Sequence, residues 1–302
     1  MCYQKINKLN GVLLLDKPTG FSCNYIIQSI KRFFSVKKIG YIGTLDPLAT
    51  GTLPVCFGCA TKFSKYLNDE DKKYIVTAKL GEKTHTSDSY GYIISKKKKN
   101  ISNSKILKCL MSFLGMNKQS PSMYSSIKFY GIPLYIYARQ NIFIPNIKRI
   151  INIYNINILN LNKKFITFKI HCSKGTYIRT LVEDFGNKLG CGAHVVMLRR
   201  LHISCYYESN LISYNKILNI SYKERNKIEL IKNLLLPVDS LTSFLPKVFF
   251  DKNKLKMLKL GKKIFILYLN IGFYTVFEKL SKKFFGVGKY KKDGYFYIDR
   301  IF

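Results

Sequence analysis

The segment 40–51, with the sequence GYIGTLDPLATG, most limits how this chain can fold. It holds three glycines, one proline and one carboxylate within twelve residues. Glycine adopts backbone conformations that other residues avoid, while Pro47 fixes its own φ and keeps Asp46 out of the helical region. The segment therefore predicts a rigid loop that carries Asp46 between two regular elements.

Asp46 has two interpretations when it is considered locally. A carboxylate on a stiff loop is a candidate nucleophile or base. An aspartate before proline more often bonds backbone N–H groups and caps a turn. The local pattern favours the turn, so a catalytic role has to rest on features elsewhere in the chain.

The composition indicates a folded protein with a polyanionic partner. With 302 residues, 47% of them hydrophobic, the chain can bury a sizeable core in one large domain or in a large and a small one. A formal charge of +34 favours nucleic acid ahead of an anionic membrane surface. Because most basic residues are lysines in a chain rich in Lys, Asn and Ile, compositional drift is an alternative source of this charge.

Cysteine and histidine spacing gives no metal signature. Among the eight cysteines, Cys56 and Cys59 make one CxxC pair. The sequence lacks the second pair that a zinc site needs. These two lie in an apolar run, which predicts buried free thiols. No apolar stretch has the length of a membrane span, and none has the features of a signal peptide. We expect a cytoplasmic protein without a metal or a membrane partner.

Hydrophobic periodicity predicts the α+β class with a mixed, mainly antiparallel sheet. Expected strands are 11–15, 53–57, 72–81, 148–161, 164–172 and 193–206. Expected helices are 23–34, 61–67, 104–114, 176–189 and 223–236. Short β-like runs separated by glycines follow residue 246. We therefore expect a main domain over 1–245 and a small basic β-rich domain over 246–302.

The segment 119–141 interleaves aromatic residues with Lys128 and Arg139. Such a mixture suits RNA, because bases stack on rings and phosphates meet cations. An ordinary element with a tyrosine-rich packing face explains the same pattern equally well.

Several runs together resemble the TruB family of pseudouridine synthases, the tRNA pseudouridine-55 synthases. The runs occur in the family's order, cover residues 11 to about 240, and are highly specific in combination. They are GVLLLDKPTG (11–20), GTLDPLATG (43–51), ATKF (60–63), KY (73–74), PSMYS (121–125), YAR (137–139), CSKGTYIRT (172–180) and LRRL (198–201). Residues from 246 are loosely similar to the small PUA domain of these enzymes.

The resemblance implies a fold and a reaction. It implies the pseudouridine-synthase fold, a long mixed sheet with a central RNA-binding cleft, and an RNA-clamping insert at about 119–150. It also implies that uridine 55 in the tRNA T loop loses its glycosidic C–N bond, turns, and forms a C–C bond to the same ribose. The family requires no cofactor, and the implied partner is the T arm of tRNA, with no protein partner.

The resemblance also assigns roles to residues. It makes Asp46 the catalytic carboxylate and Arg179 its partner, and it places Tyr74 against the uracil while Tyr177 and Leu198 line the pocket. Desolvation would neutralise a carboxylate in a closed cleft, and a neighbouring guanidinium reverses that effect.

Local patterns leave other interpretations of these residues. Arg179 has a possible surface partner in Glu183, one turn later on the predicted helix. Tyr74 on an alternating strand and Leu198 are more often packing residues. Lys17 and Pro18 match a family motif that we interpret as support beneath the site.

Tyr41 departs from the family pattern, which usually has a histidine that contacts RNA bases at this position. Tyrosine retains an aromatic face and one hydrogen-bonding group, so we expect Tyr41 to bind substrate.

Other functions are weighed against this one. An RNA-folding helper without catalysis is disfavoured because Asp46, Tyr74 and Arg179 are all present. A synthase directed to other RNA by a guide complex is disfavoured by the compact C-terminal region. A phosphotransferase using Asp46 lacks a D-x-D pair and a phosphate loop.

Overall fold

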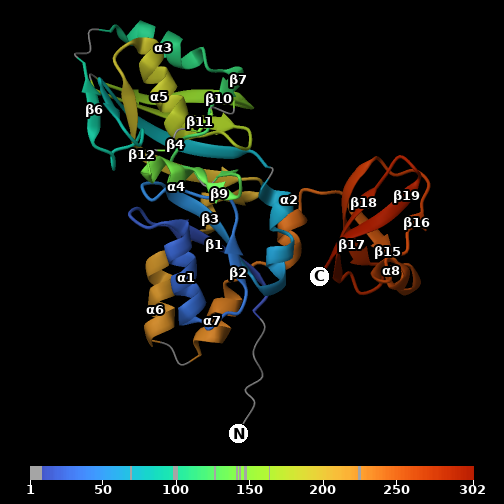
Figure 1. The fold of residues 1–302 in the computed structure, drawn as a ribbon. Helices are drawn as coiled ribbons and strands as arrows, with labels where there is room; N and C mark the ends of the chain where they lie inside the picture. The colour runs from blue at the N-terminus through green and yellow to red at the C-terminus, as the bar shows by residue number, and fades with distance from the viewer. Residues whose placement is uncertain are drawn as a thin grey trace.

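The structure is a computed structural model, and it describes residues 9–68, 70–97, 101–125, 127–140, 142, 144–145, 148–162, 164–223 and 226–302. Within these residues ten strands form one large sheet, whose main path runs β14-β1-β3-β12-β4-β11-β10-β7 (Figure 1). The pairs β1–β14 and β3–β12 are parallel, and the other pairs along this path are antiparallel. The prediction of a mixed, mainly antiparallel sheet is confirmed.

The strands of the large sheet come from distant parts of the chain. They are β1 (Gly11–Lys17), β2 (Ile39–Tyr41), β3 (Thr50–Phe57), β4 (Lys72–Leu80), β7 (Gly115–Gln119), β10 (Arg149–Leu161), β11 (Phe165–Cys172), β12 (Ala193–Ile203), β13 (Tyr206–Tyr207) and β14 (Ile212–Ser213). Two small hairpins add β5 (Glu82–Thr84) with β6 (Ile93–Lys96), and β8 (Lys128–Phe129) with β9 (Ile132–Pro133).

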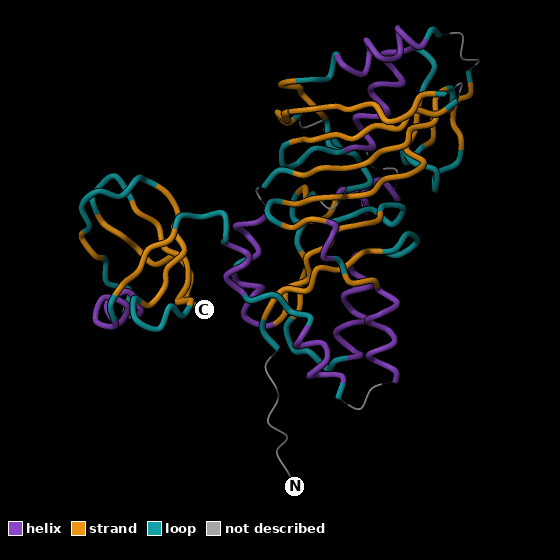
Figure 2. Tube along the Cα trace, turned by 180° about the vertical axis from the view of Figure 1, so that it is seen from behind, coloured by secondary structure: helices purple, strands orange, loops and turns teal. Residues whose placement is uncertain are grey.

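Alternation along β4 decides which face of the sheet is covered. Tyr74, Val76 and Ala78 are buried, whereas Ile75 and Thr77 between them are only partly buried and Lys73 before them is exposed. The buried side chains belong to the main core together with Phe185 of α5 (Ile178–Leu189) and residues of α3 (Asn103–Met111). In Figure 1 these two helices lie in front of the strands, and Figure 2 shows the opposite face of the same region.

The other end of the sheet is covered by α1 (Cys23–Phe33) with α6 (Tyr214–Lys223) and α7 (Lys227–Asn233) (Figure 1). The Ser22 side chain accepts a bond from the Tyr25 amide and thereby caps the start of α1. The helix predicted over 223–236 corresponds to α7, whereas α6 was not predicted. The asparagines and serine of α6 have low helix propensity and masked it in the sequence, but Tyr214 and Ile217 bury against the core.

The described residues 226–302 contain a second sheet of five strands in the order β15-β17-β18-β19-β16. These strands are β15 (Lys247–Phe250), β16 (Ile264–Phe265), β17 (Gly272–Glu278), β18 (Phe284–Tyr290) and β19 (Tyr295–Ile301). A helix absent from the prediction, α8 (Lys252–Lys259), packs on them. Its apolar pattern in the sequence is weak, because the helix buries just two residues, Leu255 and Leu258.

The second sheet lies to one side of the first, beside α2 (Ser64–Asn68) (Figure 1). Phe63 packs on Phe284 with ring centroids 5.2 Å apart, and the Thr275 hydroxyl donates to the Thr242 carbonyl over 2.8 Å. Phe63 lies between α2 and a 3₁₀ turn, Gly58–Lys62, in place of the single helix predicted over 61–67. No helix in the described part of the chain is long and apolar enough to cross a membrane.

Candidate active site

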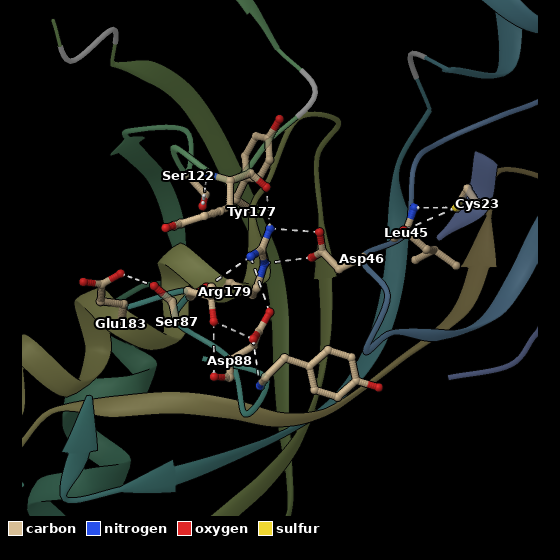
Figure 3. A network of polar contacts seen from close by, with 12 residues as sticks. Cys23, Leu45, Asp46, Ser87, Asp88, Ser122, Tyr177, Arg179 and Glu183 are labelled. Atoms are coloured by element: carbon tan, nitrogen blue, oxygen red, sulfur yellow. Dashed lines mark hydrogen bonds and ion pairs between the residues drawn. The ribbon is translucent and has the colours of Figure 1, made fainter. Parts of the chain in front are cut away.

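Asp46 lies on the loop between β2 and β3 and faces Arg179 in the first turn of α5 (Figure 3). The Nη2 of Arg179 donates to Oδ1 of Asp46 over 2.8 Å, and its Nε lies 2.8 Å from Oδ2. Arg179 is 4% exposed, whereas the Asp46 side chain is 30% exposed. The buried guanidinium therefore orients both carboxylate oxygens and leaves Asp46 open to a substrate.

Three further groups hold the Arg179 guanidinium. Its Nη1 donates to the Thr86 carbonyl over 3.1 Å and lies 3.4 Å from the Asp88 carboxylate. Its Nη2 also donates to the Tyr124 carbonyl over 2.9 Å. Sequence reasoning missed these groups, because no pattern singled out Asp88 and because the other two acceptors are backbone carbonyls.

The alternative surface pair between Arg179 and Glu183 does not form. Glu183 instead pairs with Lys83 over 2.7 Å and accepts a bond from the Ser87 hydroxyl. Helical spacing brings positions four apart onto one face, but the inward direction of Arg179 is decided by its tertiary partners.

The electrostatic surroundings of Asp46 favour proton uptake. Burial raises the pKa of Asp46, and the neighbouring Asp88 carboxylate adds to the rise. The Arg179 guanidinium and the Lys17 ammonium act in the opposite direction. The ionised form of Asp46 therefore depends on its cationic partners.

Lys17, at the end of β1, supports the loop from beneath. Its fully buried Nζ donates to the carbonyls of Pro18, Pro47 and Ala49 over 2.9, 3.2 and 2.7 Å. Burial lowers the pKa of Lys17 to about 8. These contacts agree with the supporting role expected for Lys17.

Arg200, on β12, holds the other side of the loop. Its Nε donates to the Thr52 carbonyl over 2.8 Å and its Nη2 to the Gly43 carbonyl over 2.9 Å, and the side chain is 1% exposed. Gly51 has φ +98°, and a Cβ there would lie 2.2 Å from the Arg200 carbonyl oxygen. The sequence analysis gave Arg200 no role, although it lies in the LRRL motif. The reason is that β12 meets the Asp46 loop only in the folded sheet.

Tyr74, Tyr177 and Leu198 lie around this loop. Tyr74, on β4, is 6% exposed and pairs in register with Arg200. Burial raises the pKa of Tyr74 to about 12, against the opposing effect of Arg200, and the charge of Asp46 also contributes to the rise. The Leu198 carbonyl accepts a bond from Thr50 over 3.5 Å, at the end of the Asp46 loop.

Tyr177 precedes α5, and its backbone is clamped by the side chain of Gln119. The Tyr177 amide donates to Gln119 Oε1 over 2.8 Å, and Gln119 Nε2 donates back to the Tyr177 carbonyl over 3.0 Å. This reciprocal pair ties the end of β7 to the start of the helix that carries Arg179.

Tyr41 is the last residue of β2 and is partly buried. Burial raises the pKa of Tyr41, and Tyr135 of α4 (Leu134–Arg139) is close enough to add to the rise. Part of the insert predicted at about 119–150 lies outside the described residues. Among its described residues, Tyr130 is 88% exposed and the Arg139 guanidinium lies 5.5 Å from the Tyr135 ring centre.

Comparison with known proteins decides the family. Residues 31–178 match the model of the TruB family pseudouridylate synthase N-terminal domain, and residues 179–243 match the tRNA pseudouridylate synthase B C-terminal domain. The chain is 47% identical to the tRNA pseudouridine synthase B of Buchnera aphidicola subsp. Schizaphis graminum, over 96% of this chain and 94% of that protein. The chain belongs to the TruB family.

Other relatives agree with this TruB assignment. The tRNA pseudouridine synthase B of Shewanella sp. (strain MR-7) is 41% identical over 95% of this chain and 92% of its own length. Among solved structures, a chain of a Cbf5-Nop10-Gar1 complex superposes with a TM-score of 0.75 at 22% identity, covering 99% of this chain and 87% of that one. This similarity confirms the pseudouridine-synthase fold.

Proposed function

We propose that this chain isomerises uridine 55 in the T loop of tRNA to pseudouridine, with Asp46 as the catalytic carboxylate. The observation that carries the proposal is the ion pair between a partly exposed Asp46 and a buried Arg179, at 2.8 Å, on a loop of a TruB-family chain. Relatives that are 40–48% identical over most of the chain are tRNA pseudouridine synthases B, which supports tRNA as the substrate.

The geometry suits an isomerisation in which one base leaves and rejoins the same ribose. The reaction breaks the C–N bond and forms a C–C bond, so it needs a fixed carboxylate close to the sugar and the base. Arg179 keeps Asp46 oriented. Tyr74, whose pKa of about 12 keeps it protonated at neutral pH, offers its ring and hydroxyl to the base.

Substrate binding is assigned to residues around the loop. Tyr41, Tyr177 and Leu198 would line the pocket for the uridine, which has to leave its stack to reach Asp46. The insert at about 119–150 would clamp the RNA, with exposed Tyr130 available for stacking. The domain over 246–302, in the role of a PUA-like module, would bind RNA with its lysines. Cytoplasmic localisation, where tRNA is modified, is part of the proposal.

The test uses an unmodified tRNA transcript and chemical mapping of pseudouridine. Wild-type protein should modify uridine 55, and a transcript with cytidine at that position should stay unmodified. If wild type leaves uridine 55 unchanged, the proposed substrate site is wrong.

The Asp46→Asn variant tests the residue assignment. It should bind tRNA with nearly wild-type affinity and lose at least about a thousandfold in kcat, because the amide cannot act as a carboxylate. Asp251→Asn, which alters a helix cap in the second domain, is the control and should retain activity. Retained activity in Asp46→Asn would exclude Asp46 as the catalytic group. If the wild-type protein refolds tRNA but forms no pseudouridine, the result would favour the helper function.

A further inference from the structure

Tyr90 lies on the loop between β5 and β6, at the rim of the site. Its backbone amide donates to Oδ1 of Asp88 over 3.1 Å, while Oδ2 of the same carboxylate lies 3.4 Å from Arg179. The Tyr90 side chain is 56% exposed, so packing in the core does not fix the position of its ring.

The hydroxyl of Tyr90 reaches Thr19, on the loop between β1 and α1. Its oxygen lies 3.1 Å from the Thr19 Oγ1, and Thr19 donates to the Leu48 carbonyl over 3.0 Å. A threonine hydroxyl has one proton, which goes to Leu48, so Tyr90 is the donor to Thr19. Tyr90 is therefore linked to the Asp46 loop through Thr19, which bonds that loop at Leu48, two residues from Asp46.

The ring of Tyr90 differs from other exposed tyrosine rings. Tyr25 stacks on Phe21 with centroids 5.2 Å apart, and Tyr92 stacks on His85 at 4.0 Å. Among the described residues, no aromatic ring packs against Tyr90. An exposed aromatic ring that is held at its backbone and its hydroxyl, with no other ring packed on it, is preorganised to stack on another ring.

We propose that Tyr90 is a positioning residue that stacks on the nucleobase next to the target uridine. The inference rests on the proposed function. Turning the uridine out of its stack leaves the neighbouring base without a partner on one side, and an adjacent tyrosine ring supplies one. The bond to Thr19 holds the ring in place, so little side-chain freedom is lost on binding.

The test compares Tyr90→Phe, which keeps the ring and loses the hydroxyl, with Tyr90→Leu, which loses the ring. Tyr90→Leu should raise KM for tRNA by about five- to a hundredfold, the range of one lost base–aromatic stack, with kcat within about twofold of wild type. Tyr90→Phe should stay within about threefold of wild type in KM. The Kd for tRNA, measured in the Asp46→Asn background, should follow the same order.

Tyr207→Leu is the matched control, because Tyr207 is 57% exposed, much like Tyr90. Its ring packs on His202, which pairs in register with Lys73. Lys73 lies on the face of β4 opposite to Tyr74, so Tyr207 lies away from the site. Its KM should not change. A Tyr90→Leu variant with wild-type KM and Kd would overturn the proposal, as would an equal fall in kcat for the Phe and Leu variants. The Kd comparison needs no turnover, so it judges Tyr90 even if uridine 55 is not the target.

Discussion

At the scale of single residues, the arrangement to explain is one guanidinium between two carboxylates. Arg179 contacts Asp46 at 2.8 Å and Asp88 at 3.4 Å, and Asp88 is 5% exposed. A planar guanidinium has five donors, so it can hold Asp46 in a side-on geometry and still be anchored by Asp88 and backbone carbonyls. Asp88 thus fixes the direction of Arg179 but adds a negative charge near Asp46.

This charge predicts a specific pH dependence. Because burial and then Asp88 raise the pKa of Asp46, the carboxylate takes up a proton at higher pH than an ordinary aspartate, whose pKa is 3.8. Activity that needs the ionised form is therefore lost earlier as the pH falls. In Asp88→Asn the acid limb of kcat/KM should move to lower pH, because a negative neighbour is gone, while kcat should fall by up to about a hundredfold as Arg179 loses an anchor.

The profile is measured as kcat/KM from about pH 4.5 to pH 8, with stability followed in parallel. Glu208→Gln is the control, because Glu208 pairs with Arg199 and has no contact with Arg179. Its acid limb should match that of wild type. An acid limb at higher pH in Asp88→Asn would contradict the electrostatic account.

At the scale of elements, the Asp46 loop is rigid because two buried cations bind its carbonyls. Loop carbonyls outside a ladder still need donors when they are buried. Lys17 donates to the loop carbonyls of Pro47 and Ala49, and Arg200 donates to the loop carbonyl of Gly43 and to the Thr52 carbonyl in β3. Two distant strands, β1 and β12, thereby hold one turn in a single conformation.

Gly51→Ala should break this arrangement. Its φ of +98° is unfavourable for alanine, and the new Cβ would lie 2.2 Å from a backbone oxygen that cannot move freely. We expect the free energy of unfolding to fall by about 3 kcal/mol or more in urea titrations, with loss of activity. Gly190→Ala is the control: Gly190 has φ +80° and nothing within 4 Å of the added Cβ, so it should cost about 1 kcal/mol. Equal costs would show that the contact with Arg200 is unimportant.

At the scale of the whole molecule, the protein that contains the two sheets is strongly basic. The second sheet is fixed to the preceding part of the chain by the packing of Phe284 on Phe63 and by the bond from Thr275 to Thr242. Its helix α8 and the turn that follows carry exposed lysines, namely Lys252, Lys254, Lys256, Lys259, Lys262 and Lys263. With a formal charge of +34, phosphate contacts should dominate affinity.

Binding of tRNA should therefore depend steeply on salt. If about six to ten phosphates are contacted, the affinity should fall by roughly 10³- to 10⁵-fold between 50 and 200 mM salt, because each contact releases counterions. Turnover of saturated enzyme should change little, since the Asp46–Arg179 pair is partly shielded from ions. Filter binding across a salt series measures the slope, and Lys256→Gln with Lys259→Gln should reduce it. A flat salt dependence would favour compositional drift as the origin of the charge.

Local sequence determined the features that depend on neighbouring residues. The glycines and Pro47 indicated a stiff loop, and hydrophobic periodicity over 72–81 indicated a strand, because backbone preference acts over a few residues. The family motifs named Asp46, Arg179 and Tyr74 as candidates, and their chemical roles stay predictions.

Tertiary structure alone decided which side chains meet. Arg179 bonds Asp46, 133 positions away, in place of Glu183 one turn along the helix. Asp88 and Arg200 gained roles because strand order brought their elements to the loop, and α6 formed because the core buries Tyr214. Side-chain direction and burial come from packing between distant segments, and this placement determines the charge, the pKa and the access of Asp46.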